Sequence, residues 1–253
     1  MDNKLKLDLP RKQNLESGID LRSITIENWG LIDYKKAWDQ QTSIHQEIIE
    51  KKRNKTENSF TGPGRLIFCE HEKVFTLGRS GKESNLLMNL DWLKSKGIDF
   101  YKINRGGDIT YHGPGQIVLY PIIDLDYFFN DVHKYVRKLE EIVIQVIATF
   151  NIQGYRHPDF TGVWVKSRMD GHAKKICAIG VHMSRWVTLH GLAFNVHTDL
   201  TPFEYIVPCG IRDPEKGVTS LHLETELEIN RHHVQALMEH HFAKEFDCKY
   251  IEN

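Results

Sequence analysis

Apolar residues recur at steps of three and four along several stretches of the chain, and this spacing predicts amphipathic helices. Asp33 has a side chain suited to cap the first of them, and Gly97 is a typical stop for a short one. The longest apolar stripe follows Asp131 and ends at Phe150. Helices are therefore predicted over residues 33–52, 89–97, 131–150 and 230–246.

Between these helices lie short runs rich in β-branched and aromatic residues, which are typical of strands. The runs cover residues 65–71, 73–77, 99–103, 116–124, 161–165, 175–183 and 185–196. Because several runs follow one another without a helix between them, mixed rather than purely parallel pairing is expected. The sequence thus predicts a single α/β domain over residues 21–253, with a mixed, largely antiparallel sheet flanked by helices. The charged residues 1–20 predict a flexible lead-in, and the polar stretch 53–64 predicts a loop.

Composition narrows the class of protein. The 253 residues carry 33 basic and 34 acidic side chains, a net charge of 33 − 34 = −1. The chain therefore lacks the excess of basic residues that is typical of nucleic-acid-binding proteins. No apolar run approaches the roughly 20 residues of a membrane helix, and the polar N-terminus lacks the apolar core of a secretory signal. Four scattered cysteines do not suit a disulfide framework. We therefore expect a cytoplasmic protein that binds neither nucleic acid nor membrane, with a monomer as the default state.

The glycine-dense segment RGGDITYHGPG, residues 105–115, lies between two predicted strands. Its glycines let the backbone approach a ligand closely, and Arg105, Thr110, Tyr111 and His112 add polar groups. A hairpin with elaborate turn chemistry is the structural alternative, but a bare turn needs fewer special residues. Neither a phosphate-binding P-loop nor a dinucleotide-binding glycine pattern is present. The segment is interpreted as a binding loop.

One of the four cysteines stands in a distinctive setting. Cys209 lies between a proline and a glycine, which predicts a sharp turn, and it is either a nucleophile or a small buried apolar residue. Cys69 and Cys177 lie inside apolar strands, where packing is the expected role. Cys248 has no supporting pattern.

A reactive cysteine must be a thiolate, and a nearby cation favours that form. Lys174 and Lys175 begin a predicted strand. Strict alternation places Lys175 on the same face as Cys177, and Lys174 on the opposite face with Ala178. Lys174 is interpreted as a solvated strand end, so Lys175 is the candidate partner of a thiolate.

Three ordered motifs resemble one enzyme family. The segments RGGDITYHGPGQ, KICAIGVHMSRWVTLHGLAFNV and DLTPFEYIVPCGI, the last followed by GVTSL, are similar to segments of the octanoyltransferases. These enzymes, also called lipoyl(octanoyl) transferases, begin protein lipoylation. The resemblance runs from about Ile24 to Leu223. It implies the biotin and lipoate protein ligase fold and an acyltransferase that needs no cofactor.

The resemblance also implies roles for the matching positions. Cys209 would form the acyl-thioester intermediate, and Lys175 would lower the pKa of that cysteine. Because Lys174 directly precedes Lys175, an off-by-one assignment stays open. Backbone N–H groups of the glycine segment, or around Gly210, would stabilise the tetrahedral oxyanion. The acyl substrate would be lined by Arg105, Gly106, Gly107, Asp108, Ile109, Thr110, Tyr111, His112, Ala178, Ile179, Gly180, Gly191, Leu192 and Ala193.

The implied donor is octanoyl-acyl-carrier protein, and the implied acceptors are lipoyl domains of 2-oxoacid dehydrogenase complexes and the glycine cleavage H protein. Because carrier proteins are typically acidic, Arg79, Lys82 and Arg105 form a hypothetical docking patch. No HExxH or CxxC pair is present, so no metal site is expected. Three alternatives stay open: an ATP-dependent lipoate or biotin protein ligase, a non-catalytic carrier-protein binding module, and a cysteine hydrolase that uses His112 or His190.

Overall fold

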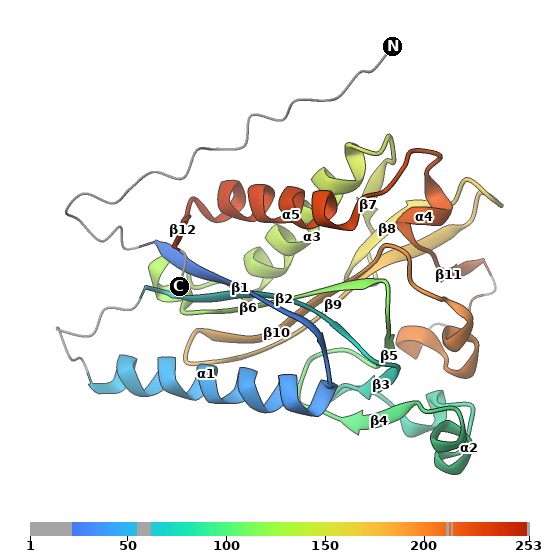
Figure 1. Cartoon of the computed structure of the whole chain (residues 1–253), viewed down its shortest axis with the longest axis horizontal. Coiled ribbons are helices and arrows are strands. Elements are labelled where there is room, and N and C mark those ends of the chain that lie inside the picture. The colour runs from blue at the N-terminus through green and yellow to red at the C-terminus, as the bar shows by residue number, and fades with distance from the viewer. Residues whose placement is uncertain (1–21, 55–61, 211–212, 214, 252–253) are drawn as a thin grey trace.

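The computed structural model describes residues 22–54, 62–210, 213 and 215–251 (Figure 1). The predicted lead-in 1–20 lies outside the described residues, and so does most of the predicted loop 53–64. Among the helices that are described, none is long and apolar enough to cross a membrane.

Strands from both ends of the chain meet in one large sheet, which crosses the middle of Figure 1. In spatial order its strands are β12 (Lys249–Ile251), β1 (Ser23–Ile32), β2 (Gly64–His71), β6 (Gln116–Ile123), β10 (Val187–Asn195), β9 (Ala173–Ser184), β8 (Val163–Lys166) and β7 (Gly154–Arg156), with β11 (Lys216–Val218) added to β9. β1 pairs in parallel with β12 and β2, and β11 pairs in parallel with β9. The other pairs are antiparallel. The predicted mixed, largely antiparallel sheet is confirmed.

Helices cover both faces of this sheet (Figure 1). α1 (Tyr34–Asn54) packs on β6 and β10, while α3 (Val132–Ala148) and α5 (Arg231–Phe246) pack on each other at the opposite face. Each helix begins after a side chain that accepts a hydrogen bond from a first-turn N–H group: Asp33 from Lys36, Asp131 from Lys134, and Asn230 from His232. The predicted helices are confirmed to within a few residues at their ends.

A second sheet lies beside the large one, near the start of α1 (Figure 1). It consists of β4 (Asp99–Lys102), β3 (Val74–Leu77) and β5 (Ile109–His112), and the short helix α2 (Leu90–Ser95) contacts β4. β5 corrects the sequence analysis, which interpreted all of residues 105–115 as a loop. Its four residues are buried and pair antiparallel with β3. That pairing joins segments far apart in the chain, so local composition does not reveal it.

The two faces of the large sheet bury different kinds of side chain. Toward α3 and α5 lies the main apolar cluster, with fully buried residues such as Leu139, Ile142 and Phe242. Toward α1 and the small sheet, apolar residues share the interior with buried polar ones such as Gln41 and His71. Buried polar groups need partners or a function, and the candidate site lies on this polar face.

Candidate active site

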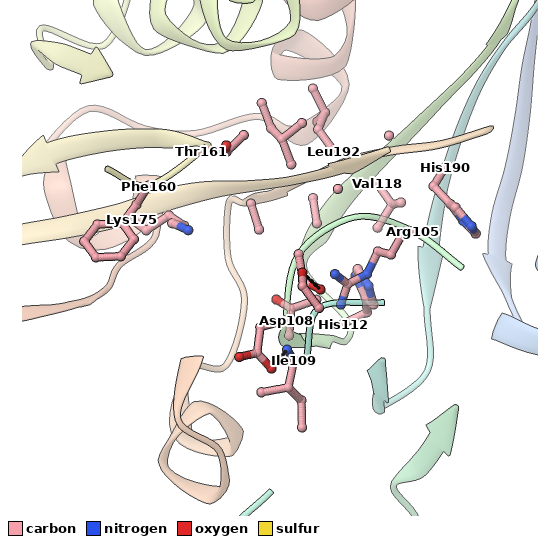
Figure 2. Close-up of a pocket in the computed structure, with 18 of the residues that line it drawn as sticks. Arg105, Asp108, Ile109, His112, Val118, Phe160, Thr161, Lys175, His190 and Leu192 are labelled. Atoms are coloured by element: carbon pink, nitrogen blue, oxygen red, sulfur yellow. Dashed lines mark hydrogen bonds between the residues drawn. The ribbon is translucent and has the colours of Figure 1, made fainter. Parts of the chain in front are cut away.

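A cavity of about 300 Å³ opens on the polar face of the large sheet. Its walls come from β9 and β10 on one side and from the glycine segment, β5 and the start of α1 on the other. In Figure 2, Lys175 and Phe160 stand at one side of this cavity and His190 stands at the other, with Arg105 and His112 between them. The volume is within the range of small-molecule sites.

A bulge in β9 turns Lys175 into the cavity. Consecutive residues of β8 pair with Cys177 and then with Lys175, so Ile176 is left without a partner in the ladder. Because one extra residue reverses the alternation of side chains, Lys175 lines the cavity together with Ala178. Cys177 instead packs in the apolar cluster of the opposite face. The expectation that Lys175 shares a face with Cys177 is therefore wrong.

Lys175 is closely packed by its neighbours. Its side chain is 6% exposed, and its Nζ lies 5.1 Å from the ring centroid of Trp164, close enough for a cation–π contact. At Gly162, where φ is +118°, a Cβ would lie 2.5 Å from a backbone oxygen of β9 and 3.4 Å from the Lys175 Cδ. Glycine therefore lets the chain pass close to the bulge. Lys174 points elsewhere, and its Nζ lies 2.6 Å from Asp170, so of the two lysines it is Lys175 that lines the cavity.

Arg105 anchors the glycine segment instead of facing solvent. Its Nη2 donates to the backbone oxygen of Thr76 at 2.6 Å, and the N–H of Gly106 donates to the backbone oxygen of Val181 at 2.9 Å. At Gly180, a Cβ would lie 2.9 Å from the Gly106 oxygen, so glycine there permits the close approach. Since Arg105 is 8% exposed, the hypothesis of a docking patch that contains it is wrong.

The backbone of Cys209 lies in a single turn of 3-10 helix, Pro208–Gly210. Pro208, Lys175 and Thr110 line a small hollow, and Lys175 and Thr110 also line the main cavity. Cys209 is therefore the next residue after Pro208, which lines the same small hollow as Lys175. This arrangement brings together the Pro-Cys-Gly motif, the lysine strand and the glycine segment.

Asn85 and Asp108 brace this turn. The Asn85 Nδ2 donates to the Asp108 Oδ2 at 2.6 Å, and the Asn85 backbone oxygen accepts from the N–H of Val207 at 2.7 Å. Gly210 has a φ of +70°, and a Cβ there would lie 2.7 Å from the Asp108 Oδ2. The N–H of Gly210 already donates to the backbone oxygen of Val207. This N–H group is therefore not available to stabilise the oxyanion.

Comparison with known proteins identifies the family. Residues 33–243 match the lipoyl protein ligase A/B catalytic domain. The chain belongs to this family. The octanoyltransferase of Cytophaga hutchinsonii is 50% identical over 92% of this chain and 96% of its own. The octanoyltransferase of Flavobacterium psychrophilum is 48% identical over 91% and 99%. The predicted resemblance to octanoyltransferases and the predicted acyltransferase class are confirmed.

Solved structures of lipoate protein ligases share the fold. A bi-partite lipoate protein ligase from Thermoplasma acidophilum has a TM-score of 0.66 at 17% identity, over 92% of this chain and 87% of its own. Lipoate-protein ligase A bound with ATP has a TM-score of 0.62 at 17% identity, over 91% and 88%. At such low identity the likeness concerns the fold alone, and it confirms the predicted lipoate-ligase-like architecture.

Most of the residues to which the family resemblance assigned roles meet around the cavity. Those that line it are Arg105, Gly107, Asp108, Ile109, Thr110, His112, Lys175, Ala178, Ile179, Gly180, Gly191, Leu192 and Ala193. Gly106 and Tyr111 do not line it: Gly106 bonds to β9, and Tyr111 packs against Phe75 and Phe203. The roles themselves stay predictions.

Several residues that line the cavity were not predicted from the sequence. Tyr34 begins α1, where the helical periodicity made it part of an apolar stripe, and Tyr120 lies inside an apolar strand. Phe160 and Thr161 precede β8 and carry no motif of their own. The only signal for the two tyrosines is a hydroxyl at a buried position, because a buried hydroxyl needs a partner.

Three buried histidines lie at or beneath this cavity. Burial lowers the pKa of His112 to about 3, with the neighbouring His71 contributing, and burial lowers the pKa of His190 to about 3. Burial likewise lowers the pKa of His71 to about 4, and its Nε2 lies 2.7 Å from the Tyr120 hydroxyl. All three imidazoles are therefore neutral near pH 7.

The two strand cysteines are placed as the sequence predicts. Cys69 and Cys177 are fully buried, and burial raises the pKa of each thiol far above its ordinary value. A thiol in that state is a poor nucleophile because it holds its proton.

Proposed function

We propose that this acyltransferase moves an octanoyl group from an acyl-carrier protein to a lysine of lipoyl domains through a thioester on Cys209. The observation that carries the proposal is the bulge in β9, because it places Lys175 in the cavity. Lys175 also lines the small hollow next to this cavity, together with Pro208, the residue before Cys209. The close octanoyltransferase relatives support the choice of acyl group. Small residues of β9 and β10, Gly180 and Gly191, leave room for an acyl chain.

In the first step, the Cys209 thiolate attacks the carbonyl carbon of the carrier's thioester. A carbon–sulfur bond forms to Cys209, and the bond to the carrier's sulfur breaks, so the carrier leaves as a thiolate that takes a proton. The Lys175 ammonium favours the thiolate form of a neighbouring cysteine by charge. One thioester replaces another, so the step needs no ATP.

In the second step, the neutral amine of the acceptor lysine attacks the acyl-enzyme carbonyl. An amide bond forms, the bond to the Cys209 sulfur breaks, and the proton lost by the amine passes to the departing sulfur. The amine must lose its ordinary ammonium proton before it attacks, which requires a nearby base or a desolvated position. We assign Lys175 to stabilising the Cys209 thiolate before the first step and the negative charge that develops on the same sulfur as it departs in the second.

The test is mass spectrometry of the intact protein after incubation with octanoyl-acyl-carrier protein and no ATP. We expect one octanoyl adduct in the unchanged protein and in the matched control Cys177→Ser, and none in Cys209→Ala. Addition of an apo-lipoyl domain should then discharge the adduct and leave an amide on the domain. An adduct that persists in Cys209→Ala would falsify the proposed thioester, and transfer that requires ATP and free octanoate would indicate a ligase.

A further inference from the structure

A second hollow lies beside the cysteine turn. It is an open groove of about 610 Å³ between the segment after β10 and the segment that leads into α4 (Leu221–Glu224). Its walls include Asp199, Glu204, Pro208 and Val218. The groove is separate from the cavity that we assign to the acyl chain. Most of its lining belongs to the segments DLTPFEYIVPCGI and GVTSL, in which a role was predicted only for Cys209 and the backbone around Gly210.

The groove and the acyl cavity meet at the cysteine turn. Phe203, Pro208 and Val218 line the groove and also line the small hollow that contains Lys175. That hollow shares Lys175 with the main cavity. Cys209 follows Pro208 in the chain, so the turn that bears the nucleophile stands at the boundary between the two spaces. A group that lies in the groove thus reaches the turn through a space other than the acyl cavity.

The chemistry of the groove suits a lysine side chain. Asp199 and Glu204 are exposed carboxylates, and Leu200, Phe203 and Val218 provide apolar surface. Lysine buries its four-carbon stem along apolar surface and keeps its charged end near carboxylates. A carrier's phosphopantetheine arm bears a negative phosphate, which the two carboxylates repel.

Two further features indicate that the groove takes a ligand. Thr198 lines it and is 6% exposed, and its hydroxyl has no hydrogen-bond partner among the described residues. A buried hydroxyl without a partner is costly, and a ligand that shifts the groove wall enough to bond it removes that cost. The rings of His197 and His222 pack at 5.4 Å between centroids, and burial lowers the pKa of His197. That imidazole therefore does not offset the carboxylates near pH 7.

We propose that this groove receives the acceptor lysine and its flanking backbone, so that the amine reaches the acyl-enzyme through the groove and not through the acyl cavity. Asp199 and Glu204 attract the ammonium as the acceptor approaches, and the apolar wall holds the stem. The ammonium then gives its proton to solvent, and the neutral amine attacks the acyl-enzyme. This inference rests on the proposed function, because it presumes an acyl-enzyme at Cys209.

The test separates the two half-reactions. The octanoyl-enzyme is first formed from octanoyl-acyl-carrier protein and quantified by mass spectrometry, and its discharge by an apo-lipoyl domain is then followed. For Asp199→Asn and for Glu204→Gln we expect unchanged acyl-enzyme formation and a KM for the acceptor raised about three- to fivefold each, as for loss of an exposed ion pair. The rate at saturating acceptor should change less than KM. Glu50→Gln, an exposed carboxylate on α1, is the matched control.

The outcomes distinguish this inference from the proposed function. If no acyl-enzyme forms in the unchanged protein, the proposed function is wrong, and the inference about the groove falls with it. If acyl-enzyme forms and both variants discharge it with an unchanged KM, the inference is overturned. Slower acyl-enzyme formation with normal discharge would instead assign the groove to the carrier. Because the Asp199 Oδ1 accepts from the N–H of Thr201, Glu204→Gln serves as the variant without a role in the local turn.

Discussion

The two faces of the large sheet show how one fold separates stability from chemistry. Toward α3 and α5 the interior is mainly apolar, with Glu140 as a buried charge bound by Arg137 and Arg156. Toward α1 and the small sheet, buried histidines, tyrosines and Arg105 surround a cavity. The bulge in β9 divides the two: Cys177 belongs to the first face and Lys175 to the second. Substitutions on the first face should change stability at any pH, and those on the second should change activity or the way that stability and activity depend on pH.

Acidification should give the largest effect, and it should act on the polar face. The folded pKa values of His112 and His190 are about 3 and that of His71 is about 4, below the ordinary 6.5. The unfolded chain therefore binds more protons below pH 6.5, so stability present above that pH is lost as pH falls toward 3. By pH 5 each histidine should cost about 2 kcal/mol.

Urea unfolding at pH 7 and pH 5 checks this expectation. His190→Gln should lose less stability than the unchanged protein over that interval, because one neutral buried imidazole is removed. His233→Gln, on the exposed side of α5, is the control and should show the unchanged protein's dependence. Equal losses in all three proteins would contradict the assignment of acid sensitivity to the polar face.

On the apolar face, Phe242→Ala should reduce the free energy of unfolding by about 3–5 kcal/mol, the usual cost of a large buried cavity. Phe242 is fully buried and stacks on Phe246 at 4.3 Å between ring centroids. Denaturant unfolding measures the loss. Transfer activity per folded molecule should stay near that of the unchanged protein, and a selective loss of activity would show that the two faces are coupled.

On the polar face, Lys175→Ala should lower the rate of acyl-enzyme formation about 100-fold near pH 7, as removal of a charge-stabilising group does. The rate should recover partly at higher pH, where more of the cysteine is thiolate without help. Lys174→Ala is the matched control, since Lys174 lies outside the cavity and pairs with Asp170. A pH profile parallel to that of the unchanged protein would refute thiolate stabilisation by Lys175.

The smallest effect is expected at the hydrogen bond between Asn85 and Asp108, which supports the cysteine turn. Asn85→Ala removes the donor to Asp108 and should cost about 1 kcal/mol of stability, because a half-buried carboxylate oxygen loses this hydrogen bond. Acyl-enzyme formation should slow several-fold as the turn loses its support. Asn85→Asp places a second carboxylate beside Asp108, and it should slow formation further and shift the pH profile upward. Stopped-flow or quenched mass spectrometry at several pH values separates the two variants.

Much of the fold follows from local pattern. Helices α1, α3 and α5 were predictable because their apolar stripes repeat over several turns and their caps are adjacent in sequence. β5 was not, because its partner β3 lies more than thirty positions earlier and its own composition is that of a glycine-rich loop. The ordered motifs predicted the family, since whole motifs carry information that single residues do not.

The sequence by itself determined the helices, most strands, the family and the residue types available to the site. Only the tertiary structure decided which face Lys175 occupies, because a bulge reverses the alternation that the sequence predicts. It likewise decided that Arg105 is buried and that Tyr34 and Phe160 line the cavity. The physical reason is the range of the forces involved: periodicity and capping act between near neighbours, whereas pairing and burial join segments that are distant in the chain.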